Sequence, residues 1–176
     1  LMKSDSFERF AGLSAMLVGI SGLLYAVAFI LLKNDLLSSL FLLLGGLLTT
    51  PVIVALYARL RDTDGSFALW ALALGILGAA GAAVNGGYGL ANAINPPALL
   101  PKDTPIQSDP RGLLTFGVSG IALLVNAWLI TRSSHFSKGL GYLGWLLAPL
   151  VIVLYLGRLI ILTPTNPVIA APAQVA

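Results

Sequence analysis

The amino-acid sequence predicts an all-α protein, a polytopic bundle of five transmembrane helices. Of its 176 residues, 57% are hydrophobic and only 10% are charged, whereas an average soluble domain carries about 25% charged residues. The mean hydropathy is +0.93. Five stretches hold the roughly 20 mainly apolar residues that a membrane-spanning helix needs. These spans are expected at about 10–32, 36–58, 67–95, 112–131 and 139–163.

The first two spans are expected to form a helical hairpin, because only the polar turn Lys33-Asn34-Asp35 separates them. Asp5-Ser6-Phe7-Glu8 has the form of a capping box, which would start the first helix ahead of the bilayer. The first apolar run is about twice as long as the 7–15 residues of a signal peptide, so we expect a retained anchor. Thr49-Thr50-Pro51 predicts a proline kink, rather than a gate, at which the threonine hydroxyls donate hydrogen bonds to the freed carbonyl groups.

The remaining connections are charged or rich in proline. The loop at 59–66 ends in Asp64-Gly65-Ser66, which are helix N-cap residues. Residues 95–110 contain five prolines and predict a stiff external loop. The tail at 164–176 is too short and too rich in proline to span, so it is either an interfacial segment or the start of a sixth span in a longer chain. Residues 1–176 are otherwise expected to form one integral membrane domain.

The basic residues predict the orientation, because short cytoplasmic loops carry an excess of Lys and Arg. Six of them fall at one end of the predicted bundle and four at the other, which places the N-terminus in the cytoplasm and the C-terminus outside. We expect the protein in the cytoplasmic (inner) membrane of a bacterium. The net charge of +3 does not indicate nucleic acid, because no basic patch is present. The six are Lys3, Arg9, Arg59, Arg61, Arg132 and Lys138, and the four are Lys33, Lys102, Arg111 and Arg158.

Small residues at heptad spacing predict where the helices pack. Membrane helices associate through close approach of their backbones and through interhelical hydrogen bonds, because lipid tails are as apolar as leucine. The expected packing residues are Gly12, Gly19, Gly22, Gly75, Gly78, Ala82, Gly89 and Ser119.

Several polar side chains lie within or close to the spans, and two interpretations of them stay open. They form interhelical hydrogen bonds, worth about 0.6 kcal/mol each, or they form a polar cluster that contacts a small ligand or ion. In the second case the glycines at 86–89 would let the third helix unwind, as helices of transporters do. The candidates are Asn85, Tyr88, Asn92, Asn126, Tyr155 and Arg158.

Arg158 is the one charge inside an otherwise apolar run. It lies about 7.5 Å from the predicted helix end at 1.5 Å per residue, within reach of the interface. We expect a structural ion pair with Asp103 or Asp109 of the external loop. A substrate-binding role for an intramembrane charge is the alternative.

The sequence offers almost nothing for catalysis. It contains no cysteine, one histidine and one glutamate, and every carboxylate falls in a predicted loop or terminus. Nucleophile elbows, phosphate-binding loops and zinc motifs are absent from it. We therefore expect no enzyme activity, no metal and no cofactor, although a bound lipid or pigment remains open.

Short motifs along most of the chain resemble small uncharacterised bacterial multi-spanning inner-membrane proteins, of the kind grouped as domains of unknown function. That resemblance implies no activity, cofactor or catalytic residue, and such proteins often have a sixth span. The motifs are Ala55–Arg61, Phe67–Trp70, Asp109–Leu114, Gly157–Ile160 and Pro164–Pro167.

Together these observations predict a non-catalytic integral membrane protein. The leading hypothesis is an accessory or structural subunit that packs against other transmembrane proteins in a bacterial respiratory or photosynthetic complex. The alternative is a small transporter, or a membrane bundle that binds a small molecule, lipid or pigment. Membrane lipids and other transmembrane subunits are the expected partners.

Overall fold

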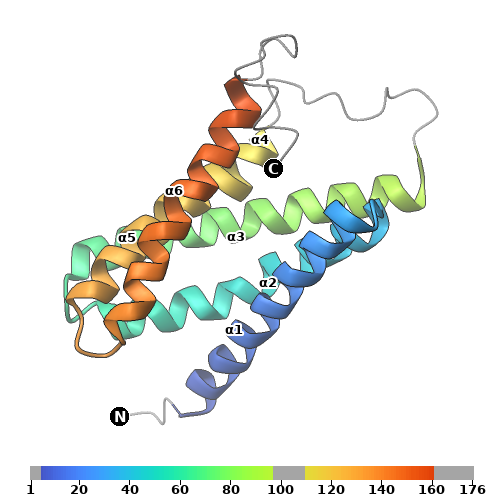
Figure 1. Ribbon diagram of the computed structural model, residues 1–176. Coiled ribbons are helices and arrows are strands. Elements are labelled where there is room, and N and C mark those ends of the chain that lie inside the picture. The colour runs from blue at the N-terminus through green and yellow to red at the C-terminus, as the bar shows by residue number, and fades with distance from the viewer. Residues whose placement is uncertain (1–4, 97–109, 161–176) are drawn as a thin grey trace.

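The computed structural model describes residues 5–96 and 110–160, and all regular structure in them is helical (Figure 1). The predicted helical bundle is thereby confirmed. The first helix consists of α1 (Asp5–Ala26) and a π-helical end, η1 (Val27–Leu31). It is followed by α2 (Asp35–Leu60), α3 (Gly65–Ile94), a fourth helix made of α4 (Pro110–Gly112), η2 (Leu113–Val118) and α5 (Ser119–Arg132), and α6 (Lys138–Ile160).

The helices suit a membrane by length, composition and the distribution of their side chains. Four stretches are long and apolar enough to cross a bilayer, at Ser6–Leu31, Asp35–Leu60, Gly65–Ile94 and Leu113–Arg132; Lys138–Val153 is a shorter apolar stretch of α6. Eight of the twelve buried apolar side chains in the described part are alanine, whereas many leucines, isoleucines and phenylalanines are exposed. A water-soluble fold buries its large apolar side chains, so this inside-out distribution indicates that hydrocarbon surrounds the bundle.

The observed helix bounds differ from the predicted ones mainly at the ends. The first helix begins at Asp5 and the second and third begin one or two residues earlier than expected. Pro110 was expected to close the external loop, but it begins α4, in keeping with the preference of proline for the first helical turn. Most of that loop, at 97–109, and the tail at 164–176 lie outside the described residues.

Helices α1 and α2 form the expected antiparallel hairpin. Lys33 takes a left-handed conformation with φ 48°, and the side chain of Asn34 caps α2 by accepting a hydrogen bond from Leu37 N at 3.0 Å. At the open end of the hairpin, the Glu8 carboxylate lies 2.6 Å from the Arg59 guanidinium. The structure thus gives Glu8 a partner 51 residues away, where the sequence pattern suggested a local capping role.

Helices α2 and α3 approach so closely that their backbones touch at two glycines. A Cβ atom added to Gly46 would lie 2.5 Å from Ala83 N and 2.7 Å from Ala79 O of α3. A Cβ atom added to Gly86 would lie 2.7 Å from Ser39 O of α2. The two helices therefore meet reciprocally, each placing a glycine against the main chain of the other.

Helix α1 packs on α2 through a different stripe of small residues from the expected one. A Cβ atom added to Gly12, Gly19 or Gly22 would meet no atom within 4 Å. The stripe in contact with α2 lies one residue earlier, about 100° around a helix of 3.6 residues per turn. The sequence contains both stripes, and which one faces α2 depends on how α1 is rotated. The buried residues of this stripe are Ala11, Ser14, Ser21 and Ala28.

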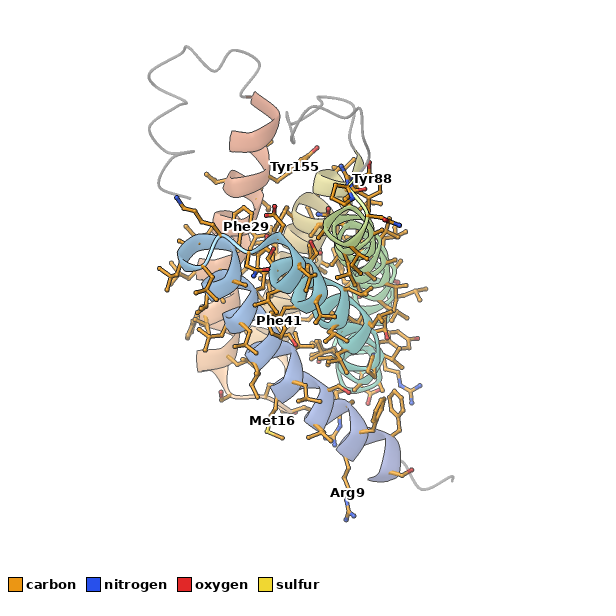
Figure 2. All side chains as sticks on the ribbon, turned by 90° about the vertical axis from the view of Figure 1, so that its right-hand side faces the viewer. Arg9, Met16, Phe29, Phe41, Tyr88 and Tyr155 are labelled. Carbon is orange, nitrogen blue, oxygen red and sulfur yellow. The ribbon has the colours of Figure 1, made fainter. Side chains whose placement is uncertain are left out.

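Consecutive helices are neighbours in space, and the two terminal helices lie on the same side of the others. In the described part, α1 packs on α2, α3 on both α2 and η2/α5, and α6 on α5 and η2. Figure 1 shows α1 passing in front of α2 and α6 passing in front of α5 and α3, and in Figure 2 α6 and the upper part of α1 lie toward the left. The bundle thus has a three-helix layer and two flanking helices that do not close against each other.

Pro51 lies inside α2, and the neighbouring threonine hydroxyls donate to carbonyl groups of the preceding turn, as the sequence predicted. Proline has no N–H, so Leu47 O lacks its usual helical donor. Thr50 Oγ1 donates a hydrogen bond to Leu47 O at 2.8 Å, and Thr49 Oγ1 donates one to Gly45 O at 2.7 Å. The helix continues through the proline without interruption from Asp35 to Leu60.

The contact of Gly46 with α3 predicts a stability difference between adjacent glycines. Gly46→Ala is expected to lower the free energy of unfolding by about 1–3 kcal/mol, the usual cost of overpacking, because the new Cβ meets main-chain atoms. Gly45→Ala is the matched control with the same gain in helix propensity, since its Cβ would lie 3.8 Å from Ser21 Cβ. Unfolding by SDS in mixed micelles measures both, and equal losses would contradict the backbone contact.

The hydrogen bond of Thr50 predicts a dependence on its neighbouring proline. Thr50→Val is expected to cost about 0.6 kcal/mol of unfolding free energy, a typical value for a hydrogen bond within a membrane protein. In a Pro51→Ala background the restored N–H donates to Leu47 O, so the same substitution is expected to have almost no effect. The same SDS titration of the four variants tests this, and a cost that is independent of residue 51 would argue against it.

Candidate functional site

A large apolar groove runs along the bundle between α1 and α6. Residues of α1 and α6 form its walls, and residues of α2, α3 and η2/α5 form its floor. We call it the central groove. Its volume is about 1070 Å3, at the upper end of the roughly 300–1,000 Å3 of small-molecule sites. Glu8 and Arg59 line it at one end, and Tyr25, Phe116 and Val151 line it farther along.

Small residues from every helix line the central groove, and many of them were predicted at helix interfaces. Gly12 and Gly22 lie in its wall without a neighbouring helix. Gly75, Gly78, Ala82 and Ser119 lie in its floor, where they also separate packed helices. A Cβ atom added to Gly75 would lie 2.8 Å from Ile53, and one added to Gly78 would lie 3.1 Å from Ser119 Cα. Gly89 faces the Ser39 side chain of α2.

A row of polar side chains on η2 and α5 faces the central groove. Thr115, Ser119 and Asn126 all line it, and Thr115 and Asn126 are only 6% and 7% exposed. Asn85 Nδ2 of α3 donates to Thr115 Oγ1 at 3.4 Å, while Asn126 Nδ2 donates to Ala122 O of its own helix at 2.9 Å. Thr115 lies in a π-helical segment, a conformation that is frequent at functional sites.

The structure spreads the polar residues expected from sequence over several places. Asn85 bonds to Thr115, and Asn126 lies 11 residues farther along the fourth helix, about 16 Å away at 1.5 Å per residue. Tyr88 lies under the Arg111 guanidinium at 4.0 Å from its ring centre. Tyr155 packs against Gly117, and both tyrosines lie at the end of the bundle opposite Arg9 (Figure 2).

Asn92 and Arg158, the two other polar residues expected to form a cluster, add no described contact to the residues above. Asn92 is half-buried on α3 and does not line the central groove. The side chain of Arg158 and its expected partners Asp103 and Asp109 lie outside the described residues, so that ion pair stays a prediction. Helix α3 continues through the glycines at 86–89 to Ile94, which favours interhelical hydrogen bonding over an unwound ligand site.

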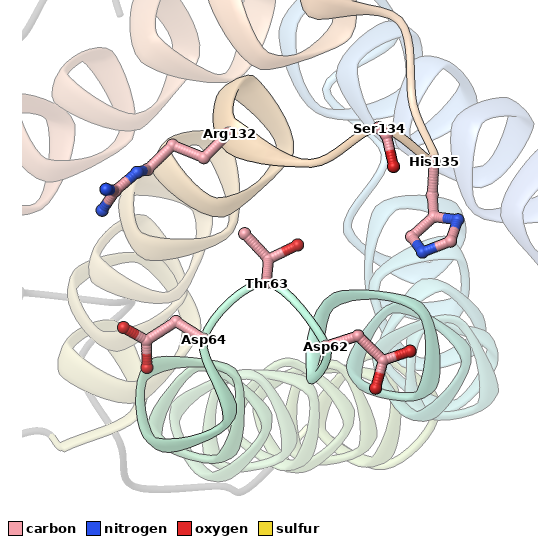
Figure 3. A pocket seen from close by; sticks show the side chains of 6 residues that line it. All are labelled: Asp62, Thr63, Asp64, Arg132, Ser134 and His135. Carbon is pink, nitrogen blue, oxygen red and sulfur yellow. The ribbon is translucent and has the colours of Figure 1, made fainter.

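A second, polar pocket lies where the 61–64 and 133–137 loops meet, at the end of the bundle that we call the basic end. Its volume is about 460 Å3. Figure 3 shows Arg132 on the side of Asp64, His135 on the side of Asp62, and Thr63 between them. The remaining lining residue is Ser134.

The side chains of this pocket mainly serve the local structure. Asp64 Oδ1 caps α3 by accepting from Phe67 N at 3.1 Å, and the Arg132 guanidinium covers the Trp128 ring at 4.6 Å from its centre. Asp62 lies 3.9 Å from Arg61 in an exposed pair. Among the described residues, no group of three His, Cys, Asp or Glu side chains could hold a metal ion. The described residues of the pocket therefore do not form a three-ligand metal site.

Sequence reasoning did not find the partners that complete these sites. Thr115 lies near the start of the predicted fourth span, and no local pattern indicates its hydrogen bond to Asn85, which lies 30 residues earlier in the chain. The pairing of Arg59 with Glu8 and of Arg111 with Tyr88 joins segments far apart in sequence, so no local pattern indicates it. No family model, curated protein or solved structure matches the chain.

The bond between Asn85 and Thr115 predicts a measurable coupling between α3 and the fourth helix. Asn85→Leu and Thr115→Val are each expected to lower the unfolding free energy, and a double-mutant cycle is expected to give a coupling of about 0.6 kcal/mol. Asn92→Leu with Thr115→Val is the control cycle and is expected to give a coupling near zero. Equal coupling in both cycles would show that the two side chains do not interact directly.

Proposed function

We propose that this chain is a non-catalytic accessory subunit of a membrane protein complex and packs against transmembrane helices of other subunits. The observation that carries the proposal is the central groove, which stays open along the bundle between α1 and α6. Its lining is rich in glycine, alanine and serine, the residues that let helix backbones approach in a membrane. A surface of this kind suits a neighbouring protein helix.

The proposal includes five crossings of a bacterial inner membrane, with the N-terminus in the cytoplasm and the C-terminus outside. Support comes from the grouping of basic residues. Arg59 lies in the last turn of α2 and Arg132 in the last turn of α5, beside the 61–64 and 133–137 loops of the basic end. Lys33 and Arg111 lie at the opposite end. A respiratory or photosynthetic complex is the proposed setting, in line with the resemblance to small bacterial inner-membrane proteins.

The roles of the acidic side chains support a non-catalytic protein. Glu8 pairs with Arg59 at 2.6 Å, Asp64 caps α3, and Asp62 pairs with Arg61. Each of these carboxylates is engaged at the basic end, away from the polar row of Thr115, Ser119 and Asn126. General acid–base catalysis needs a titratable group within hydrogen-bond reach of a substrate. The described groove lining contains Glu8 and Arg59, which pair with each other, and Tyr25.

The alternative function is that of a small transporter or a bundle that binds a small molecule, lipid or pigment. The volume of the central groove, about 1070 Å3, favours it, because ligand sites are concave, mostly apolar and carry a few polar groups. The polar row on η2 and α5 would then orient the ligand.

Extraction of the native membrane in mild detergent tests the proposal. We expect the chain to migrate with larger membrane proteins in a fixed stoichiometry that persists through size-exclusion chromatography. A monodisperse chain that carries a small molecule, identified by native mass spectrometry, would contradict it and favour the alternative. Because the chain has no cysteine, single cysteines at Lys33 and Arg61 also report orientation. Only Lys33→Cys is expected to react with a membrane-impermeant thiol reagent outside intact cells.

A further inference from the structure

We propose that the central groove binds one transmembrane helix of the partner subunit. That helix has small residues on the face toward the groove and a hydrogen-bond donor at the depth of Asn126. The inference rests on the proposed function and adds to it the place of contact and the kind of partner. Three independent observations carry it: an unused stripe on α1, an acceptor on α5 that faces the groove without a described donor, and the length of the groove.

The first observation is that α1 carries two stripes of small residues and uses only one within the bundle. Ser14 and Ser21 are buried toward α2, whereas Gly12 and Gly22 line the groove and a Cβ atom on either would meet nothing within 4 Å. Small residues at this spacing let a helix approach closely. A lipid chain gains nothing from such spacing, because it adapts to larger side chains equally well.

The second observation is the amide of Asn126, which is 7% exposed and lines the groove. Its Nδ2 donates to Ala122 O at 2.9 Å, but its Oδ1 accepts no hydrogen bond from any residue that the structure describes. The Oδ1 atom is open to the groove rather than fully buried, and an acceptor that faces hydrocarbon without a donor costs about 1–3 kcal/mol. The occupant of the groove is therefore expected to supply a donor.

The depth of Asn126 identifies the source of that donor. It lies six residues before Arg132, about 9 Å from the basic end of the helix at 1.5 Å per residue. Hydrocarbon chains have no donor, and lipid ester groups only accept hydrogen bonds. A transmembrane helix can present Ser, Thr, Asn or Gln at this depth, as membrane helices do across their interfaces.

The third observation is the length of the groove. Its wall on α1 extends from Glu8 to Tyr25, which corresponds to about 25 Å along a helix axis. The hydrocarbon core of a bilayer is about 30 Å thick. One helix that crosses the membrane therefore matches the groove along nearly its whole length.

Site-specific crosslinking in the intact complex tests the inference. A short photoreactive maleimide is attached at Gly12→Cys or Ala15→Cys in the groove, and at Leu13→Cys or Met16→Cys as controls. The controls lie on the same turns of α1 and are 53% and 62% exposed. We expect one protein adduct of defined mass, identified by peptide sequencing as a transmembrane helix, from the groove positions only. The control positions are expected to label lipid.

A second variant tests the donor. Asn126→Val is expected to raise the dissociation constant of the partner about threefold, the equivalent of one membrane hydrogen bond. Asn92→Val is the control, since Asn92 lies outside the groove, and it is expected to leave the partner's affinity unchanged. Both are compared in the purified complex by titrating release of the partner with detergent.

Several outcomes would overturn the inference while leaving the proposed function in place. In the first, a copurifying partner crosslinks from Leu13→Cys and Met16→Cys rather than from the groove positions, or gives no groove-specific adduct at all. In the second, the partner binds the Asn126→Val and Asn92→Val variants with equal affinity. Groove adducts with lipid alone, or with a second copy of this chain, would also overturn it. Absence of any copurifying membrane protein would instead refute the proposed function itself.

Discussion

The arrangement of the whole bundle depends on the backbone contact between α2 and α3 at Gly46 and Gly86. In hydrocarbon, burial of large apolar side chains gives no advantage over contact with lipid, so close packing and hydrogen bonds must hold helices together. Gly46 lies against Ala79 and Ala83 of α3, and Gly86 lies against the main chain of α2 near Ser39. The other helices pack on this pair: α1 packs on α2, the fourth helix packs on α3, and α6 packs on the fourth helix.

The open groove is a consequence of this order. Short connections make α1 and α2, and likewise α5 and α6, antiparallel neighbours, so α1 and α6 each pack mainly on the helix next to them in sequence. Both come to lie on the same face of α2, α3 and α5 (Figure 1), and the space between them is the central groove. Water would drive such a groove to close, whereas a bilayer does not, because its hydrocarbon can fill the space until a better-fitting surface replaces it.

The positions of the helices, the turn at 33–35 and the cap at Asp64 could be predicted because they are local. Bilayer thickness sets the length of each apolar run, and a cap needs only a side chain within three residues. The threonine that compensates for Pro51 is local for the same reason. The partners of Asn85, Glu8 and Tyr88 could not be predicted, because each contact joins two helices and depends on how both are rotated.

The sequence alone therefore determined the class of protein, the approximate helix ends and the small number of chemically reactive side chains, since these depend on composition and on neighbours along the chain. Only the tertiary structure decided which stripe of α1 meets α2, that Asn85 bonds to Thr115 while Asn126 lies apart, and that a groove remains between α1 and α6. The physical reason is rotation: one residue of offset turns a helix by about 100°. In a chain rich in small residues, several rotations satisfy the same pattern until the neighbouring helices select one.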